Sequence, residues 1–163
     1  MRPGYSPGLV TRLYSLLTVK LYCSPVASSS RKPGESAGVR ALIVEDDHSW
    51  QQILSEILTD VGLSVDVAEN LEMALATLGA APYRLAVVDL SLDRSNHHNQ
   101  DGLRVLDAVH LQNPDCVSLL LTGFATSEII ESAVTEHGAL ACLRKEDFRR
   151  AEFRELVNQA LAD

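Results

Sequence analysis

Carboxylate side chains follow two of the apolar runs in this sequence. Glu45 and Asp46 come directly after the run 39–44, and Asp89 closes the run 85–89. If the two runs are neighbouring strands, the three carboxylates converge, and they repel one another unless a cation or a proton intervenes. Mg²⁺ is the expected cation, because it binds carboxylate oxygens, carbonyl oxygens and waters and usually completes its octahedron with phosphate oxygens. The pattern therefore predicts phosphoryl chemistry at a metal site.

Two further polar side chains suit the same chemistry. Thr122 follows the apolar run 116–121, and Lys145 comes shortly after the run 140–143. An aspartate such as Asp89 can attack a phosphoryl group to give an acyl phosphate, while a lysine neutralises charge on that group and a hydroxyl hydrogen-bonds it. Taken alone, Lys145 would be an ordinary solvated charge. Its place beside the other strand ends makes it a candidate site residue.

Alternating strands and helices must position these side chains. From residue 39 onward, strand-length apolar runs alternate with segments of helical periodicity. The predicted strands are 39–44, 64–68, 85–89, 116–121 and 140–143, and the predicted helices are 48–61, 71–78, 103–111, 127–137 and 148–161. Parallel crossovers need long connections and place helices on both faces, so the sequence predicts an α/β fold with a doubly wound, five-stranded parallel sheet. Ligands of such folds bind outside the carboxyl ends of the strands.

The first predicted helix combines capping residues with a core stripe. Asp47 is its expected N-cap, because an aspartate there accepts hydrogen bonds from free N–H groups, and Gly62 is placed to end it. Trp50 starts an apolar stripe of three- and four-residue spacing. That spacing indicates a core residue rather than a cofactor contact.

The cysteines and the paired histidines predict no site of their own. Cys23, Cys116 and Cys142 form no C-x-x-C pair, so reduced thiols are expected rather than disulfides or a zinc site. Cys142 is expected to be a small buried filler rather than a redox switch. His97 and His98 lie in a polar loop without a partner at ligand spacing, so we expect them to be solvated.

Charge and composition separate a leading tail from one domain. Residues 1–38 carry five basic side chains and one acidic one, whereas residues 39–163 carry nine basic and 21 acidic side chains, a net charge of −12. An acidic domain repels phosphate backbones, so direct nucleic-acid binding is not expected. No run approaches the roughly 18 to 20 apolar residues of a membrane span. We therefore expect a soluble, cytoplasmic protein without membrane insertion.

The predicted tail, residues 1–38, is expected to be disordered and basic. It is rich in proline and serine and contains its first acid only at Glu35. Arg12 and Lys20 interrupt any secretory apolar core, which argues against a signal peptide. An organellar transit peptide and a start codon assigned too far upstream stay open as alternatives.

Five motifs in order carry a resemblance to a known family. The segments ALIVEDD (41–47), LAVVDLSL (85–92), DGL (101–103), LLLTGFAT (119–126) and GALACLRK (138–145) resemble the receiver domain of bacterial two-component response regulators. The resemblance spans residues 39–161, and the combination is far more specific than any one motif. It implies the flavodoxin-like (βα)5 three-layer sandwich with strand order 2-1-3-4-5.

The resemblance also implies roles for individual residues. Asp89 would be the phosphoacceptor, Thr122 the switch hydroxyl and Lys145 the phosphoryl contact. The implied Mg²⁺ ligands are the acidic pair and the residues at the strand-three end: Glu45, Asp46, Asp89 and the carbonyl of Ser91.

Three features depart from the family pattern. The loop after Asp89 is several residues longer than usual and has Asp93 at the usual proline position. Cys142 occupies the aromatic position three residues before Lys145, so the coupled movement of threonine and ring cannot operate in its usual form. Glu146 replaces the customary proline, which removes the residue that makes a cis peptide inexpensive and predicts a different backbone path there.

The leading interpretation is a stand-alone response regulator receiver in a phosphorelay, because no output domain follows the last predicted helix. Asp89 would accept a phosphoryl group from a sensor histidine kinase or a histidine phosphotransfer protein, with self-catalysed phosphotransfer and dephosphorylation as the only enzymatic steps. Output would be contact with an unknown downstream protein through the segments 127–137, 140–143 and 148–161, which include Ile129, Ile130 and Phe153.

Two alternatives stay open. A receiver-fold interaction module without regulated switching is motivated by Cys142, Glu146 and the long loop. A haloacid-dehalogenase-like phosphatase also starts from a strand-end aspartate, but it needs a general acid two residues later, where this chain has Ser91.

Overall fold

One parallel sheet organises the chain. The computed structural model describes residues 38–162, apart from residues 94 and 97. Its five strands are β1 (Arg40–Val44), β2 (Ser64–Ala68), β3 (Leu85–Asp89), β4 (Val117–Thr122) and β5 (Ala141–Arg144). They pair in the order β2-β1-β3-β4-β5, all parallel. The predicted doubly wound α/β fold with the flavodoxin-like strand order is confirmed.

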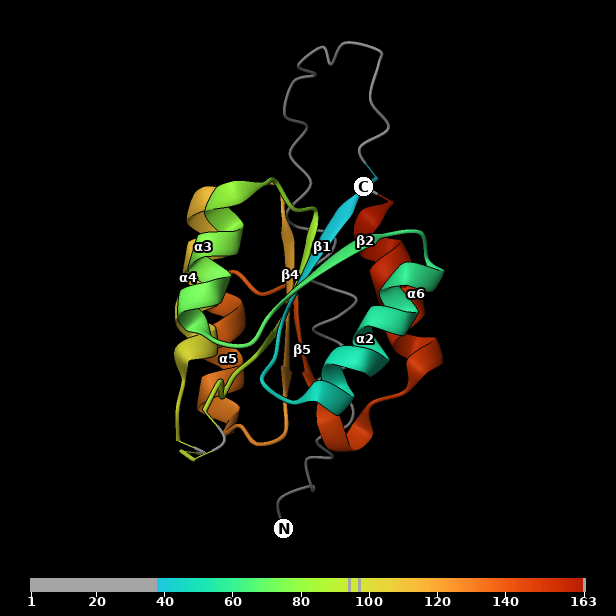
Figure 1. Cartoon of the computed structure of the whole chain (residues 1–163). Helices are drawn as coiled ribbons and strands as arrows, with labels where there is room; N and C mark the ends of the chain where they lie inside the picture. Colours follow the sequence, from blue (N-terminus) through green and yellow to red (C-terminus); the bar gives the residue numbers. More distant parts are fainter. Residues whose placement is uncertain (1–37, 94, 97, 163) are drawn as a thin grey trace. The chain divides into compact units, whose positions relative to one another are not determined.

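Helices cover both faces of this sheet and make a three-layer domain. The α-helices are α2 (His48–Asp60), α3 (Leu71–Ala80), α4 (Asp101–Gln112), α5 (Ser127–Thr135) and α6 (Arg150–Leu161), and a 3-10 turn, η1 (Lys145–Asp147), follows β5. Figure 1 shows α3, α4 and α5 on one face and α2 with α6 on the other. None of the helices in the described part of the chain is long and apolar enough to span a membrane.

The central strands of the sheet carry apolar side chains on both faces, because helices bury both of these faces. Alternate residues of β1 point to opposite sides: Leu42 belongs to the core under α3, α4 and α5, and Ile43 to the core under α2 and α6. Strand β3 is buried along its whole length, including Asp89 at its end. The near-continuous apolar runs of the sequence are explained by this two-sided burial.

Local signals set the ends of α2 as the sequence predicted. Asp47 is the N-cap, and its carboxylate accepts hydrogen bonds from the backbone N–H groups of Ser49 and Trp50 at 2.8 and 3.3 Å. At the other end Gly62 has φ +90, and its N–H donates to the Thr59 carbonyl while Leu63 donates to Leu58. This paired arrangement is a Schellman motif, which glycine makes possible.

One boundary difference, at the start of the last helix, has a clear physical cause. We predicted a helix over 148–161, but α6 begins at Arg150, and Phe148 has extended backbone with φ −62 and ψ 127. Its ring packs between Trp50 and Phe153, and that tertiary contact overrides the helical spacing that placed it in the helix. The predicted tail lies outside the described residues, apart from residue 38.

Candidate functional site

Three carboxylates meet at the carboxyl ends of β1 and β3. Strands β1 and β3 are direct neighbours, with Val44 paired to Val88, so the residues that follow each strand lie side by side. One oxygen each of Glu45, Asp46 and Asp89 lies within 4.8 Å of the others. Glu45 and Asp89 are buried, and Asp46 is half-buried. The convergence predicted from the sequence is therefore present.

Lys145 joins two of these carboxylates from the end of the edge strand β5. It begins η1, directly after β5. Its Nζ donates a hydrogen bond to Oδ2 of Asp89 at 2.7 Å and lies 2.7 Å from Oε2 of Glu45. The chain brings these groups together although 56 positions separate Lys145 from Asp89.

The electrostatics of the cluster follow from its burial. Burial, assisted by the charge of Asp89, raises the pKa of Glu45 to about 8. Burial also raises the pKa of Asp89, although Lys145 acts in the opposite direction. For Lys145, burial favours the neutral amine, but the charges of Asp89 and Glu45 outweigh it and raise its pKa. Lys145 therefore stays protonated, and its positive charge stabilises the ionised forms of Asp89 and Glu45.

One oxygen of the cluster still lacks a hydrogen bond. Oε1 of Glu45 accepts from the backbone N–H of Asp47 at 3.1 Å. Oε2 is buried, and within the described chain it receives no hydrogen bond of good geometry, although the Lys145 ammonium is close. A buried oxygen with unused accepting capacity beside two other carboxylates fits a hard cation such as Mg²⁺, whose preferred ligands are oxygens.

Thr122 lies at the end of β4 with its hydroxyl already engaged. Oγ1 donates to the carbonyl of Phe124 at 3.0 Å and accepts from the Phe124 N–H at 3.2 Å. The side chain is buried, whereas Phe124 itself is 71% exposed. A hydroxyl has a single donor, so any new acceptor for Thr122 must replace the Phe124 carbonyl.

Gly102 supports Asp89 in a way that the sequence alone did not reveal. A Cβ atom at this position would lie 2.1 Å from the carbonyl oxygen of Asp89 and 2.7 Å from the Cα of Leu90. The Gly102 N–H also donates to the Leu90 carbonyl at 2.9 Å. The first turn of α4 therefore packs directly on the backbone of the candidate phosphoacceptor, and only glycine allows that approach.

Comparison with known proteins identifies this arrangement. A family model, the response regulator receiver domain, matches residues 41–158. The chain belongs to the response regulator receiver domain family. The match includes both strand ends that carry the carboxylates, and also Thr122 and Lys145.

Curated relatives of this receiver domain are regulatory proteins. It is 30% identical over 93 residues to the photosynthetic apparatus regulatory protein RegA of Cereibacter sphaeroides, which covers 57% of this chain and 48% of the relative. It is 31% identical over 104 residues to the acid tolerance regulatory protein ActR of Rhizobium meliloti, which covers 64% and 50%. The chain thus spans about half the length of these relatives.

Solved structures share its architecture. A CheY-like receiver domain protein from Methanospirillum hungatei has a TM-score of 0.68 and 25% identity, covering 76% of this chain and 94% of that one. A response regulator from Burkholderia pseudomallei, solved with a phosphorylated aspartic acid, a calcium ion and citrate, has a TM-score of 0.63 and 28% identity, covering 75% and 68%.

Two of the three departures of this receiver domain from the family pattern lie in β5 and directly after it. Cys142 is buried in the core under α5, and burial raises the pKa of its thiol to about 11, as expected of a core filler. Arg144 reaches the carbonyl of Ala125 at 3.3 Å and so ties β5 to the β4–α5 connection. Glu146 lies in η1, and the described backbone contains no cis peptide bond.

The carbonyl of Ser91 stays a prediction as a metal ligand. The Ser91 hydroxyl donates to the carbonyls of Asp93 and Asn96 at 3.4 and 3.2 Å, within the long loop after β3. His97 lies outside the described residues, and His98 is exposed, as expected of a solvated loop residue.

Proposed function

We propose that this receiver domain accepts a phosphoryl group on Asp89 from a phosphohistidine of a sensor histidine kinase or a histidine phosphotransfer protein. The observation that carries the proposal is the contact of the Lys145 ammonium with the Asp89 carboxylate at 2.7 Å, beside Glu45 and Asp46. A cation at this place suits an acceptor that becomes more negative when it is phosphorylated.

The transfer itself needs little covalent chemistry from the protein. A carboxylate oxygen of Asp89 forms a bond to phosphorus, the phosphorus–nitrogen bond of the donor breaks, and the electron pair returns to the imidazole nitrogen. Lys145 favours the ionised form of the Asp89 carboxylate, holds it in place and offers its positive charge to the incoming phosphoryl oxygens. The rigid packing of Gly102 against the Asp89 backbone keeps this acceptor fixed at the strand end.

Glu45, Asp46 and Asp89 are the residues that would hold Mg²⁺, with the Ser91 carbonyl as the predicted fourth ligand. When bound, the ion neutralises negative charge on the transferring phosphoryl group. The unused accepting capacity of Glu45 Oε2 supports this assignment. The structure from Burkholderia pseudomallei contains a calcium ion and a phosphorylated aspartic acid, which is the same kind of chemistry in a relative.

Output would pass through the β4–α5 connection. A phosphoryl oxygen on Asp89 competes with the Phe124 carbonyl for the single hydroxyl proton of Thr122. Loss of the Thr122–Phe124 bond loosens the loop that carries the exposed Phe124 ring. The predicted contact residues fit less well: Phe153 is 2% exposed, and Ile129 and Ile130 are half-buried. We therefore place a downstream protein contact at Phe124 rather than at these side chains.

We also propose that this receiver domain acts in the cytoplasm as a stand-alone receiver, through contact with another protein. The relatives RegA and ActR are about twice as long as the region they share with this chain, so their whole activities do not transfer to it. The interaction module without regulated switching remains the second candidate, favoured by Cys142 at the usual aromatic position.

Chemical phosphorylation distinguishes these readings. The full chain is mixed with acetyl phosphate and Mg²⁺, and its intact mass is followed over time beside Asp89→Asn. A single phosphoryl group adds about 80 Da, and we expect it on the wild type and not on the variant. Absence of the adduct on the wild type contradicts the proposal and favours the interaction module. Rapid multi-turnover release of phosphate favours a phosphatase instead.

A further inference from the structure

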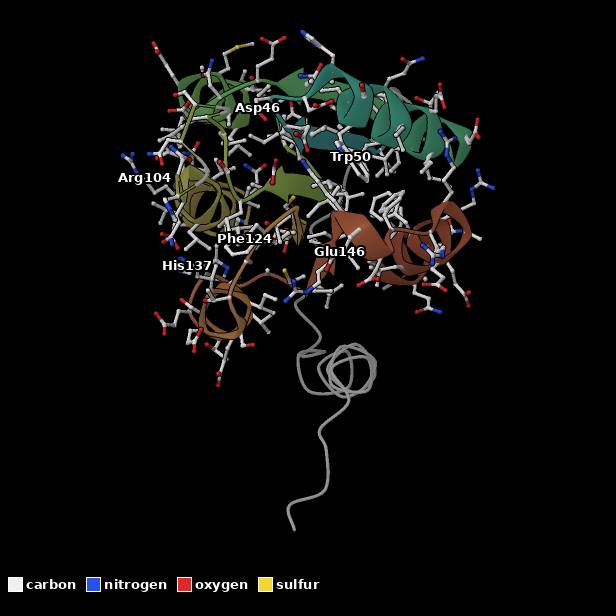
Figure 2. The ribbon with its side chains drawn as sticks, turned by 90° about the horizontal axis from the view of Figure 1, so that it is seen from below. Asp46, Trp50, Arg104, Phe124, His137 and Glu146 are labelled. Carbon is white, nitrogen blue, oxygen red and sulfur yellow. The ribbon has the colours of Figure 1, made fainter. Side chains whose placement is uncertain are left out.

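The Lys145 ammonium has an aromatic neighbour besides its two carboxylates. The Nζ atom lies 5.3 Å from the centroid of the Trp50 ring, within the distance at which a cation is attracted by an aromatic face. Lys145 is only 15% exposed, so the ring and the carboxylates enclose much of its charged end. Figure 2 looks onto this end of the sheet and shows Trp50 on α2 facing the turn that carries Glu146.

The fold holds Trp50 by its backbone and by its ring. Its backbone N–H is capped by Asp47 in the first turn of α2. Its ring meets the ring of Phe148 edge-on, with centroids 5.2 Å apart and planes at 90°. Phe148 in turn packs 5.2 Å from Phe153, which is buried in α6. An aromatic row thus runs from the core under α6 to the charged site.

This row explains a position that the sequence assigned only to the core. Trp50 packs partly against the core under α2 and α6, so the predicted stripe is real. Besides the apolar ring of Phe148, its ring also contacts a site lysine. The extended backbone of Phe148, which shortens α6, places the second ring of the row.

We propose that Trp50 is a positioning residue for Lys145 during phosphoryl transfer, a role that rests on the function proposed above. A lysine is a point charge on a flexible four-carbon stem, so its neighbours must hold the ammonium in the position where it contacts the phosphoryl group. When one Asp89 oxygen bonds to phosphorus, the carboxylate attraction that now holds Lys145 changes. The attraction of the ring does not depend on those oxygens, and the ring also excludes water from one side of the ammonium.

The test compares a ring with an aliphatic side chain at position 50. Trp50→Phe keeps an aromatic face, and Trp50→Leu keeps an apolar side chain that suits the helix stripe. Phosphorylation rates with acetyl phosphate and saturating Mg²⁺ are measured for both, after melting curves show that both are folded. If the transition state loses one partly exposed cation–π contact, the phosphorylation rate should fall about two- to fivefold. We expect Trp50→Leu to be slower by this factor and Trp50→Phe to recover a large part of it.

A double-mutant cycle separates positioning from packing. In the Lys145→Ala background, Trp50→Leu should cause no further slowing, because the ammonium that the ring positions is absent. Equal slowing in both backgrounds, or a wild-type rate for Trp50→Leu, overturns the inference. A wild type that takes up no phosphoryl group overturns the proposed function instead.

Fluorescence tests the contact without phosphorylation. The chain contains one tryptophan, so its emission reports Trp50 alone. Lys145→Ala should change the intensity or wavelength of that emission. Arg150→Ala, which removes an exposed ion pair with Glu56, should leave it unchanged. Identical emission from Lys145→Ala and the wild type contradicts the contact on which the inference depends, whether or not Asp89 is phosphorylated.

Discussion

The ammonium nitrogen of Lys145 lies 2.7 Å from Oδ2 of Asp89, and the same nitrogen lies 2.7 Å from Oε2 of Glu45. One cation thus stands between two buried carboxylates that would otherwise face each other. The arrangement ties three separate strand ends, those of β1, β3 and β5, into one site. Its energetic consequence can be measured without any donor or partner.

Removing that cation should destabilise the domain in metal-free buffer. Lys145→Met keeps the length of the side chain but leaves Asp89 and Glu45 without their counter-charge. We expect the free energy of unfolding in EDTA to fall by about 1–3 kcal/mol, as measured by urea denaturation. Millimolar Mg²⁺ should restore more stability to the variant than to the wild type, because it replaces the missing charge.

Arg150→Ala is the matched control for this prediction. Arg150 forms an exposed ion pair with Glu56 at 3.1 Å, and such surface substitutions change stability by about 0.5 kcal/mol or less. A Lys145→Met variant as stable as the wild type in EDTA would show that the buried carboxylates do not depend on the lysine.

Gly102 should tolerate no side chain. Gly102→Ala forces its Cβ against the backbone of Asp89 and Leu90, which must move. We expect a loss of about 1–3 kcal/mol in stability and slower phosphorylation of a displaced Asp89. Gly79→Ala in α3 is the control, because the nearest atom to its added Cβ would be Oε1 of Gln112, 3.8 Å away, and alanine favours helix by about 0.5–1 kcal/mol. Equal stability of the two variants would refute the close approach.

Thr122 should couple phosphorylation to the loop that bears Phe124. Hydrogen exchange of residues 123–126 is compared before and after phosphorylation. We expect faster exchange in the wild type and in Thr122→Ser, because the hydroxyl proton leaves the Phe124 carbonyl. Thr122→Ala lacks that hydroxyl, so its loop should show the same exchange in both states. A phosphorylation-dependent change in Thr122→Ala would mean that the signal takes another route.

The described cysteines should resist alkylation in the native protein. Burial raises the pKa of the Cys116 thiol to about 12 and that of Cys142 to about 11. The thiolate is the reactive form, so a raised pKa leaves less of it at any given pH. At pH 8, iodoacetamide should modify neither residue until urea unfolds the chain. Native labelling of Cys142 at the unfolded rate would reopen its interpretation as a redox switch.

Helix and strand boundaries that depend on neighbouring residues could be predicted from the sequence. Strands β2 and β3 have the predicted bounds, the Asp47 carboxylate caps the start of α2, and the positive φ of Gly62 closes its end. The convergence of Glu45 with Asp89 followed once the two strands were taken as neighbours. Those conclusions needed only periodicity, caps and the rule that parallel strands end at one edge.

Contacts between distant segments were not predictable in this way. The spacing of Trp50 is that of a core residue, and nothing in its neighbourhood indicates that Lys145 lies over its ring. Phe148 fits the helical period but is held by two other rings. Gly102 stood out only as part of a family motif, and its reason is the backbone of Asp89 in another element.

The location of the phosphoryl group among the clustered carboxylates tests the central claim most directly. Protein treated with acetyl phosphate and Mg²⁺ is reduced with borohydride, which converts an aspartyl phosphate to homoserine, and its peptides are then sequenced by mass spectrometry. We predict homoserine in place of Asp89, with Glu45 and Asp46 unchanged. Modification of Glu45 or Asp46 while Asp89 stays intact would contradict the assignment of Asp89 as the phosphoacceptor.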